Sequence, residues 1–237
     1  MIAAIHQPLY QPWQGYFSKL VRSDVFVFFD DVQFPRSRSL FNRNAIKSAT
    51  GPLWLTVPVK GKGDLLAVKD VEVDSTQNWQ QKHWRAICLN YSKAPHFAAY
   101  KPAFERVYTE RPWERFSDLC RAVIEAIASA LELQTRFVLS SELGLPAAEG
   151  AQRLVNIVKA VGADRYLTGG GAGSQRHMDA DLFERHGITV DIHAYAQEPY
   201  PQLWGPYLPD LAMIDLLFNC GGARSKERLL DGSKNAS

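Results

Sequence analysis

The sequence predicts a three-layer α/β fold with a mostly parallel sheet. The first 30 residues run strand, loop, helix, strand, with apolar strands at 2–5 and 25–29, an order that gives a parallel pair with a right-handed crossover. The C-terminal third runs helix, strand, glycine-rich loop, helix, strand, with strands at 165–168 and 188–192. Of the 237 residues, 46% are hydrophobic and 22% are charged, a composition typical of a globular protein with a buried core. We expect these four strands to be adjacent in one sheet.

The opening loop and helix follow from residues 6–21. Two prolines within five residues, Pro8 and Pro12, favour a rigid extended turn. Trp13, Phe17 and Leu20 then recur at helical spacing. This layout resembles the nucleotide-binding fold of pantothenate synthetase and related synthetases, whose first helix opens with a His-x-Gly-His motif. Only the glycine of that motif is present here.

The middle of the chain carries elements that we expect at the margin of the sheet. Two β-rich runs around a glycine- and lysine-rich turn predict a hairpin within 53–73. Residues 78–131 are expected to form a helical insertion, in which Pro95 and Pro102 break the segment 91–101. Its clearest helix is 116–131, where apolar residues recur at i, i+3 and i+4. A short strand is expected at 137–139.

The domain boundaries follow from the same reading of the chain. Neither an internal repeat nor a low-complexity tract divides it. We therefore expect a single α/β domain over residues 1–230 and a flexible tail over residues 231–237.

Charge and cysteine content exclude several classes of protein. The formal net charge is +2, so general nucleic-acid or membrane-surface binding is not expected. No apolar run reaches the ~18–20 residues that span a bilayer, and His6 and Gln7 interrupt the N-terminus before a secretory signal forms. The three cysteines are widely spaced without a CxxC pair, which argues against a zinc site and favours the cytoplasm.

Polar side chains follow the predicted strands where the strands end. His6 and Gln7 follow the first strand, and Asp30, Asp31 and Gln33 follow the second. Because ligands of open α/β sheets bind at the carboxyl ends of strands, we expect these groups to share one cleft.

Two loops add candidate ligand-binding groups. The segment from Pro35 to Lys47 carries Arg36, Arg38, Arg43 and Asn44, and we expect it to hold a phosphate or a nucleotide-sugar diphosphate. The glycine loop that begins at 169 follows another strand and predicts a backbone nest for an anion or a carbonyl oxygen. It lacks the Gly-Lys-Ser/Thr ending of a Walker A loop.

A third constellation lies near the C-terminus. Asp215 and Asn219 share one face of an apolar helix, and a carboxylate in such a stretch needs a polar partner. We expect this pair, with Tyr200 and Gln202, to line the cleft of His6, although a structural hydrogen bond is the alternative. Cys220 is either a nucleophile activated by a histidine or a structural thiol.

Several of these motifs together resemble the WbqC-like protein family. The matching segments are Ile5-His6-Gln7-Pro8-x-Tyr10-x-Pro12-Trp13-x-Gly15-Tyr16-Phe17, Ser23-Asp24-Val25-Phe26-Val27, Asp30-Asp31-Val32-Gln33-Phe34, Asn42-Arg43-Asn44, Trp54-Leu55-Thr56-Val57-Pro58-Val59, Tyr166-Leu167-x-Gly169-Gly170 and Ile214-Asp215-Leu216-Leu217-Phe218-Asn219-x-Gly221. The family takes its name from genes in bacterial O-antigen clusters. The resemblance implies a cytoplasmic biosynthetic role without supplying an agreed reaction.

Three functions remain open at this stage. The favoured one is an enzyme that performs acyl or aminoacyl transfer, or amide formation, on an amino sugar or another small metabolite. His6 would be its general base, and Asp30 or Asp31 would orient His6. The backbone of 169–171 would stabilise an oxyanion. The alternative is a non-catalytic protein that binds a carbohydrate or a nucleotide sugar through its aromatic residues. A metal hydrolase that uses His6, Asp30 and Asp31 is a distant third, since no ligand-spacing motif supports it.

The predicted catalytic residues are His6, Asp30, Asp31 and Cys220. The predicted substrate-binding residues are Gln7, Tyr10, Trp13, Gln33, Arg36, Arg43, Asn44, Gly169, Gly170, Gly171, Tyr200, Gln202, Asp215 and Asn219. No metal site and no bound cofactor are implied, and an activated acyl donor or a nucleotide sugar remains open as the co-substrate. The expected partner is a small molecule, with a carrier-bound acyl donor as a further option. Neither nucleic acid nor a membrane is expected, and the sequence leaves the oligomeric state undetermined.

Overall fold

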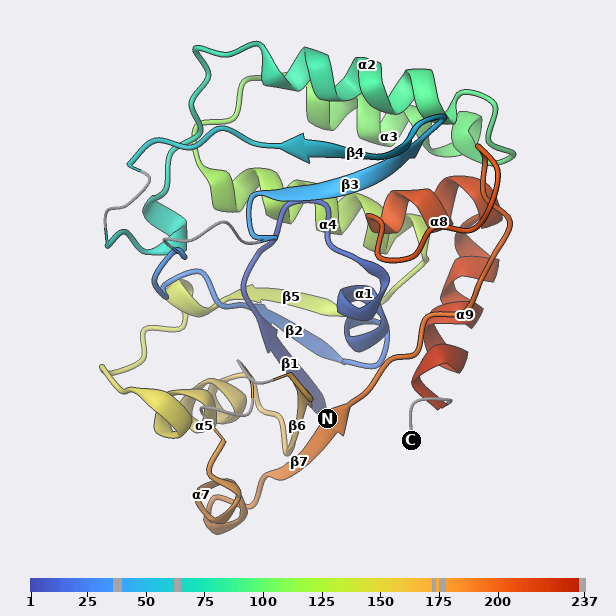
Figure 1. The fold of residues 1–237 in the computed structure, drawn as a ribbon. Coiled ribbons are helices and arrows are strands. Elements are labelled where there is room, and N and C mark those ends of the chain that lie inside the picture. Colours follow the sequence, from blue (N-terminus) through green and yellow to red (C-terminus); the bar gives the residue numbers. More distant parts are fainter. Residues whose placement is uncertain (36–39, 62–64, 172–173, 175–177, 235–237) are drawn as a thin grey trace.

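A computed structural model of the chain describes residues 1–35, 40–61, 65–171, 174 and 178–234. Its centre is a five-stranded sheet in the order β5-β2-β1-β6-β7, in which every neighbouring pair is parallel (Figure 1). The strands are β1 (Ile2–His6), β2 (Val25–Phe28), β5 (Arg136–Leu139), β6 (Arg165–Gly169) and β7 (Thr189–His193). The predicted adjacency of four strands is confirmed, and β5 adds a fifth beside β2.

Side chains alternate between the two faces of the sheet. On β2, Val25 and Val27 face one apolar cluster, whereas Phe26 and Phe28 face the other. Helices α5 (Gly150–Ala160) and α7 (Ala180–Arg185) cover the valine face. The phenylalanine face packs against the helices α1 (Gln14–Leu20), α4 (Phe116–Ala130), α8 (Met213–Cys220) and α9 (Gly222–Lys234). The expected three-layer α/β arrangement follows, because a parallel sheet must bury both faces.

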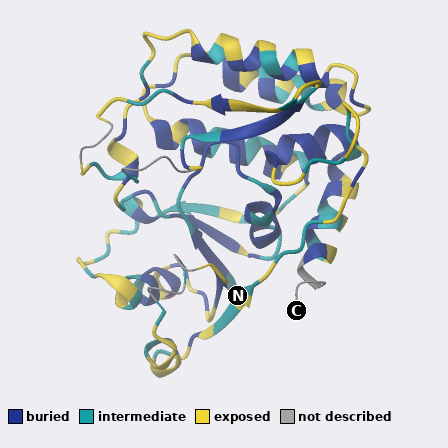
Figure 2. Cartoon of the chain, in the orientation of Figure 1, coloured by how far each residue is buried: buried dark blue, intermediate teal, exposed yellow. Residues whose placement is uncertain are grey.

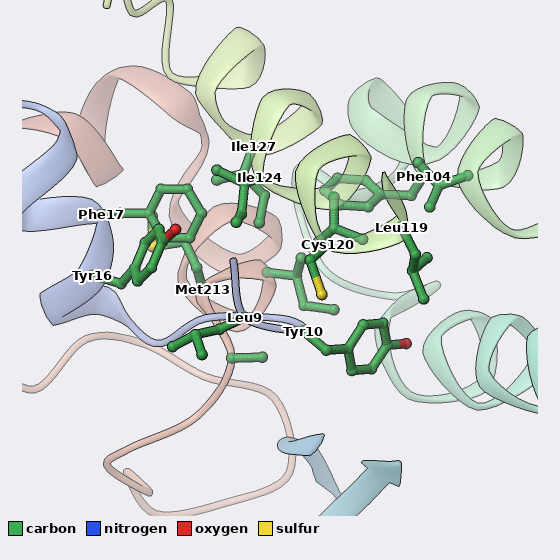
Figure 3. Close-up of a cluster of buried hydrophobic side chains, with 14 of the residues drawn as sticks. Leu9, Tyr10, Tyr16, Phe17, Phe104, Leu119, Cys120, Ile124, Ile127 and Met213 are labelled. Atoms are coloured by element: carbon green, nitrogen blue, oxygen red, sulfur yellow. The ribbon is translucent and has the colours of Figure 1, made fainter. Parts of the chain in front are cut away.

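The larger apolar cluster joins the N-terminal loop to α1, α4 and α8. Figure 3 shows Leu9 and Tyr10 of that loop beside Tyr16 of α1, Cys120 of α4 and Met213 of α8. All five side chains are buried. The loop that leaves β1 is therefore fixed between helices, which positions the end of β1.

Two further helices lie beyond α4. They are α2 (Trp79–Tyr91) and α3 (Phe97–Thr109), and they form the top of the molecule in Figure 1. The prediction that Pro102 interrupts this region was wrong, because Pro102 lies inside α3. Their outer faces are exposed whereas the faces toward α4 are buried (Figure 2).

The predicted hairpin exists, but its position differs from 53–73. It pairs β3 (Arg43–Ser48) with β4 (Gly51–Thr56) in an antiparallel two-stranded sheet. Residues 68–70 form a 3-10 turn, and the two halves of the predicted segment are joined by an isolated bridge between Val59 and Val73 and by an ion pair between Lys60 and Glu72. The hairpin begins earlier because β3 is buried on both faces, with Ala45 on one face and Ile46 on the other. The polar and basic residues around them concealed this strand.

Glycines occupy the ends of two helices. Gly162, with φ +79°, follows the end of α5 in the left-handed conformation that favours glycine. Gly222 begins α9 where an added Cβ would lie 2.0 Å from the Ala130 carbonyl oxygen, so only glycine fits between α9 and α4. No helix of the described residues is long and apolar enough to cross a membrane.

Candidate functional site

A cavity of about 680 Å³ opens at the carboxyl ends of β1, β6 and β7. We call it the crevice cavity. It is located where ligands bind in open parallel sheets. Its polar and aromatic lining residues are His6, Gln7, Trp13, Tyr16, Lys19, Phe29, Tyr166, Ser174, His193 and Tyr195, together with Gly15 and residues 169–171. Of the predicted site residues, the structure brings together here His6, Gln7, Trp13, Gly169, Gly170 and Gly171.

His6 ends β1 and presents a neutral imidazole. Its Nδ1 lies 3.0 Å from the carbonyl oxygen of Gln7, and since a carbonyl only accepts, Nδ1 carries the proton. Nε2 is then the basic nitrogen. The rings of Tyr16 and Trp13 enclose the imidazole edge-on at 4.7 and 6.3 Å between centroids. Burial, together with the nearby charge of Lys19, lowers the pKa of His6 to about 3.

Lys19 is the charged side chain that the sequence interpretation missed. It lies on α1 and is only 4% exposed, and its Nζ donates a hydrogen bond to the carbonyl oxygen of Ile5 over 3.2 Å. Burial lowers its pKa from 10.5 to about 7. The signal in the sequence was a lysine between Phe17 and Leu20, on the buried face of a helix.

His193, the last residue of β7, and Tyr195, which follows the strand, enter the cavity. The Nε2 atom of His193 is buried without a hydrogen-bond partner, and burial lowers the pKa of this histidine to about 4. The Tyr195 hydroxyl donates to Gln14 Oε1 over 2.8 Å. Among the described residues that line the cavity, none is an aspartate or a glutamate.

The glycine loop is held against β7. The Gly170 N–H donates to the carbonyl oxygen of His193 over 3.3 Å, so this N–H is engaged in the structure. An added Cβ at Gly169 would lie 3.1 Å from Ser174 Oγ. The backbone of this loop therefore forms one wall of the cavity, and no side chain at residues 169–171 separates it from an occupant.

Asp30 and Asp31 face a different set of partners from those expected. Asp30 accepts hydrogen bonds from the Ser141 N–H at 3.0 Å and from the Ser141 and Ser140 hydroxyls at 2.7 and 3.0 Å. Asp31 forms an ion pair with Arg153 at 2.6 Å. Asp31 lines a second cavity of about 610 Å³ with Ser140 and Arg153, separate from the crevice cavity in its lining. The carboxylates thus bind the start of the segment after β5, and no hydrogen bond joins them to His6 among the described residues.

Asp215 is the centre of a buried polar cluster away from the crevice cavity. Its side chain is fully buried and accepts hydrogen bonds from Tyr91 at 2.6 Å, Tyr200 at 2.8 Å and Gln202 at 2.9 Å. Burial raises its pKa, and the hydrogen bonds oppose that shift. The Asn219 amide donates to the backbone carbonyl of Asp215 over 2.7 Å. The expectation that these residues line the cleft of His6 was wrong, because α2 and the segment around 200 supply the polar partners that Asp215 needs.

A short chain of hydrogen bonds nevertheless connects this cluster to the crevice cavity. The Gln14 amide donates to the Tyr200 hydroxyl over 3.3 Å, and the Gln14 carbonyl oxygen accepts from Tyr195. Gln14 is the first residue of α1. The cluster therefore fixes the start of α1 and, through it, the orientation of Tyr195 in the cavity wall.

The cations expected to grip a phosphate are engaged elsewhere. The Arg43 guanidinium lies 4.0 Å above the ring of Trp54 on the hairpin. Lys47 Nζ donates to Gln202 at 3.0 Å and to the carbonyl oxygen of Pro206. Arg36 lies outside the described residues.

The remaining predicted residues have structural neighbours. Tyr10 is buried, with its hydroxyl 2.8 Å from His83 Nδ1. The Asn44 amide donates to the backbone of Gln11, and exposed Gln33 forms a backbone bridge to Ala67. These side chains lie outside the lining of the crevice cavity.

Cys220 lacks the surroundings of an activated nucleophile. It is half-buried at the end of α8, and burial raises the pKa of its thiol, whereas a nucleophilic cysteine needs a lowered one. No hydrogen bond joins it to His6 among the described residues. The same described residues contain no group of three His, Cys, Asp or Glu side chains that could hold a metal ion.

Comparison with known proteins identifies relatives along almost the whole chain. The model of a family described as the WbqC-like protein family matches residues 7–227. A protein of Mycobacterium tuberculosis (strain ATCC 25618 / H37Rv), named "Uncharacterized protein Rv1507c", is 37% identical over 221 residues, which cover 92% of this chain and 93% of that protein. No solved structure matches the chain.

Proposed function

Because the chain belongs to the WbqC-like protein family, we propose that it is a biosynthetic enzyme that transfers an acyl or aminoacyl group to the amine of a small metabolite, such as an amino sugar. The observation that carries the proposal is the neutral imidazole of His6 at the carboxyl end of β1, inside a cavity large enough for a small-molecule substrate. We place this activity in the cytoplasm and in the assembly of a bacterial polysaccharide or natural product.

The proposed step uses His6 as a general base. The acceptor amine attacks the activated carbonyl carbon, the C–N bond forms, and Nε2 of His6 takes the proton that the nitrogen loses. The bond to the leaving group then breaks, and His6 returns the proton to that group. The hydrogen bond from Nδ1 to Gln7 fixes the tautomer that this step requires. General-base catalysis contributes ~10²–10⁴ in rate when the pKa of the base lies near the working pH, so the pKa of His6, about 3 in the free protein, must rise when the substrate binds.

The aromatic wall of the cavity supports a flat or ring-shaped substrate. Trp13 and Tyr16 lie at the start of α1 and contact His6, and such rings pack well against the apolar faces of sugars and bases. Gly15 lies beside them, and an added Cβ there would lie 2.7 Å from Nε1 of Trp13. The absence of a side chain at this position therefore lets the Trp13 ring lie against the helix.

The test is a transfer assay with a base-deficient variant. The wild-type protein is incubated with acyl-coenzyme A thioesters and UDP-linked amino sugars, and release of the free thiol is followed together with the mass of the sugar product. His6→Asn is expected to lower kcat/KM by ~10²–10⁴. The matched control is His186→Asn, at the end of α7 and outside the lining of the cavity.

The outcomes separate the proposal from its alternative. Turnover by the wild type that His6→Asn abolishes while UDP-sugar binding persists supports general-base catalysis. Equal turnover by His6→Asn contradicts it. Binding of the UDP-sugar without turnover of any donor supports a non-catalytic nucleotide-sugar-binding protein.

A further inference from the structure

The crevice cavity contains a buried cation that no carboxylate in its described lining neutralises. Lys19 is 4% exposed, and its hydrogen bond goes to a neutral acceptor, the carbonyl oxygen of Ile5. The titratable groups around it are His6 from β1, His193 and Tyr195 from β7 and the chain after it, Tyr16 from α1 and Tyr166 from β6. All of these are neutral or basic.

A buried ammonium without a counter-ion is unfavourable. Transfer of such a charge out of water costs several kcal/mol unless a partner offsets it, and a lysine in this position exchanges between its charged and neutral forms near neutral pH. An anion placed in the cavity reverses this balance, because the ion pair forms in a low-dielectric site where Coulomb attraction is strong. The unpartnered Nε2 of His193 adds a second polar group to the same space.

We propose that the crevice cavity binds an oxyanion of its substrate, a carboxylate or phosphoryl group, and that the Lys19 ammonium is the counter-charge. Arg43 and Lys47, which the sequence suggested for this task, are engaged by Trp54 and by Gln202. Lys19 is the lysine that lines the cavity. The proposal uses the same cavity as the proposed function, but it does not depend on catalysis by His6.

Anion binding is then linked to the uptake of a proton. With a pKa of about 7 in the free protein, Lys19 is mostly neutral at pH 8 and must be protonated on binding. If only the charged form binds, the apparent Kd rises about 50-fold between pH 7 and pH 9. His6 and His193, with pKa values of about 3 and 4, stay neutral over this range. Burial raises the pKa of Tyr16, Tyr166 and Tyr195, so these hydroxyls stay protonated.

The experiment is titration calorimetry on the whole chain with two probes. UDP is the phosphoryl probe, and its terminal phosphate is doubly ionised above pH 7. Succinate is the carboxylate probe. Each titration is run at pH 7, 8 and 9 in two buffers of different ionisation enthalpy, which gives the number of protons taken up. The wild type, Lys19→Met, Lys19→Gln and the exposed control Lys159→Met are compared.

We expect about one proton to be taken up per bound probe at pH 8, and a loss of affinity of at least tenfold in both Lys19 variants but not in Lys159→Met. Binding of UDP alone identifies a phosphoryl site, and binding of succinate alone identifies a carboxylate site. The proposal is overturned if neither probe binds, if wild-type affinity is equal at pH 7 and pH 9, or if folded Lys19→Met binds as the wild type does. His6→Asn separates the two ideas, since it should retain the proton-linked binding even where it abolishes transfer.

Discussion

Replacing Lys19 with methionine should remove a pH dependence from the stability of the protein. In the folded chain the pKa of Lys19 is about 7, against 10.5 for an unperturbed lysine. Between these pH values the unfolded state binds more protons than the folded state, so the free energy of unfolding of the wild type rises with pH. Since one pKa unit corresponds to about 1.4 kcal/mol, the wild type gains about 2 kcal/mol on the methionine variant from pH 7 to pH 9. Methionine has a similar length and no charge to bury, so the variant should be the more stable protein at pH 7.

Urea unfolding at pH 7, 8 and 9 measures this difference directly. Comparison of the wild type with Lys19→Met at each pH cancels the titration of all other groups. Lys159→Met serves as the control, because this lysine is exposed in the folded protein. A stability difference between wild type and Lys19→Met that stays constant to within about 0.5 kcal/mol over this range would mean that the ammonium is solvated in the folded protein, and the reasoning on Lys19 would fail.

Three further predictions concern the framework of the site. Asp215→Ala should lower the free energy of unfolding by about 3–5 kcal/mol, measured by urea unfolding, because it leaves three buried donors without their acceptor; a loss below 1 kcal/mol would contradict this. Gly222→Ala should cost about 1–3 kcal/mol or more by the clash of its Cβ with the Ala130 carbonyl, whereas Gly171→Ala, with open space around the Cβ, should leave the melting temperature nearly unchanged. Cys220→Ser should leave transfer activity intact, and loss of turnover in a folded Cys220→Ser protein would restore the nucleophile hypothesis.

The sheet was predictable because its strands carry uninterrupted apolar runs. Residues 2–5 and 25–29 are too apolar for a surface position, and the crossover rule then places them side by side. The hairpin was harder to locate. Its first strand contains Arg43, Asn44 and Lys47. Asn44 and Lys47 concealed the strand because they are buried although they are polar, and polar side chains can be buried where they are hydrogen-bonded.

The site was partly predictable from the same rule. His6 and the glycine loop meet because β1 and β6 are parallel neighbours. Lys19 was missed because helical periodicity assigns every residue on the buried face of a helix to the apolar core. Asp215 was correctly expected to need a polar partner, but a sequence does not show which of several tyrosines lies closest.

The separation of the Asp215 cluster from the crevice cavity also limits what Asp215 does in the proposed reaction. Its carboxylate oxygens are used by Tyr91, Tyr200 and Gln202, so it has no direct path to a substrate in the cavity. Its effect reaches the cavity through the backbone bridge of Ala212 to Trp13 and through Gln14, which accepts from Tyr195 and donates to Tyr200. Because this link holds the first residue of α1, a loss of the cluster would move Tyr195 and the start of the helix that carries Lys19. In the proposed reaction Asp215 is therefore a positioning residue, and His6 and Lys19 are the side chains that we propose act on the substrate.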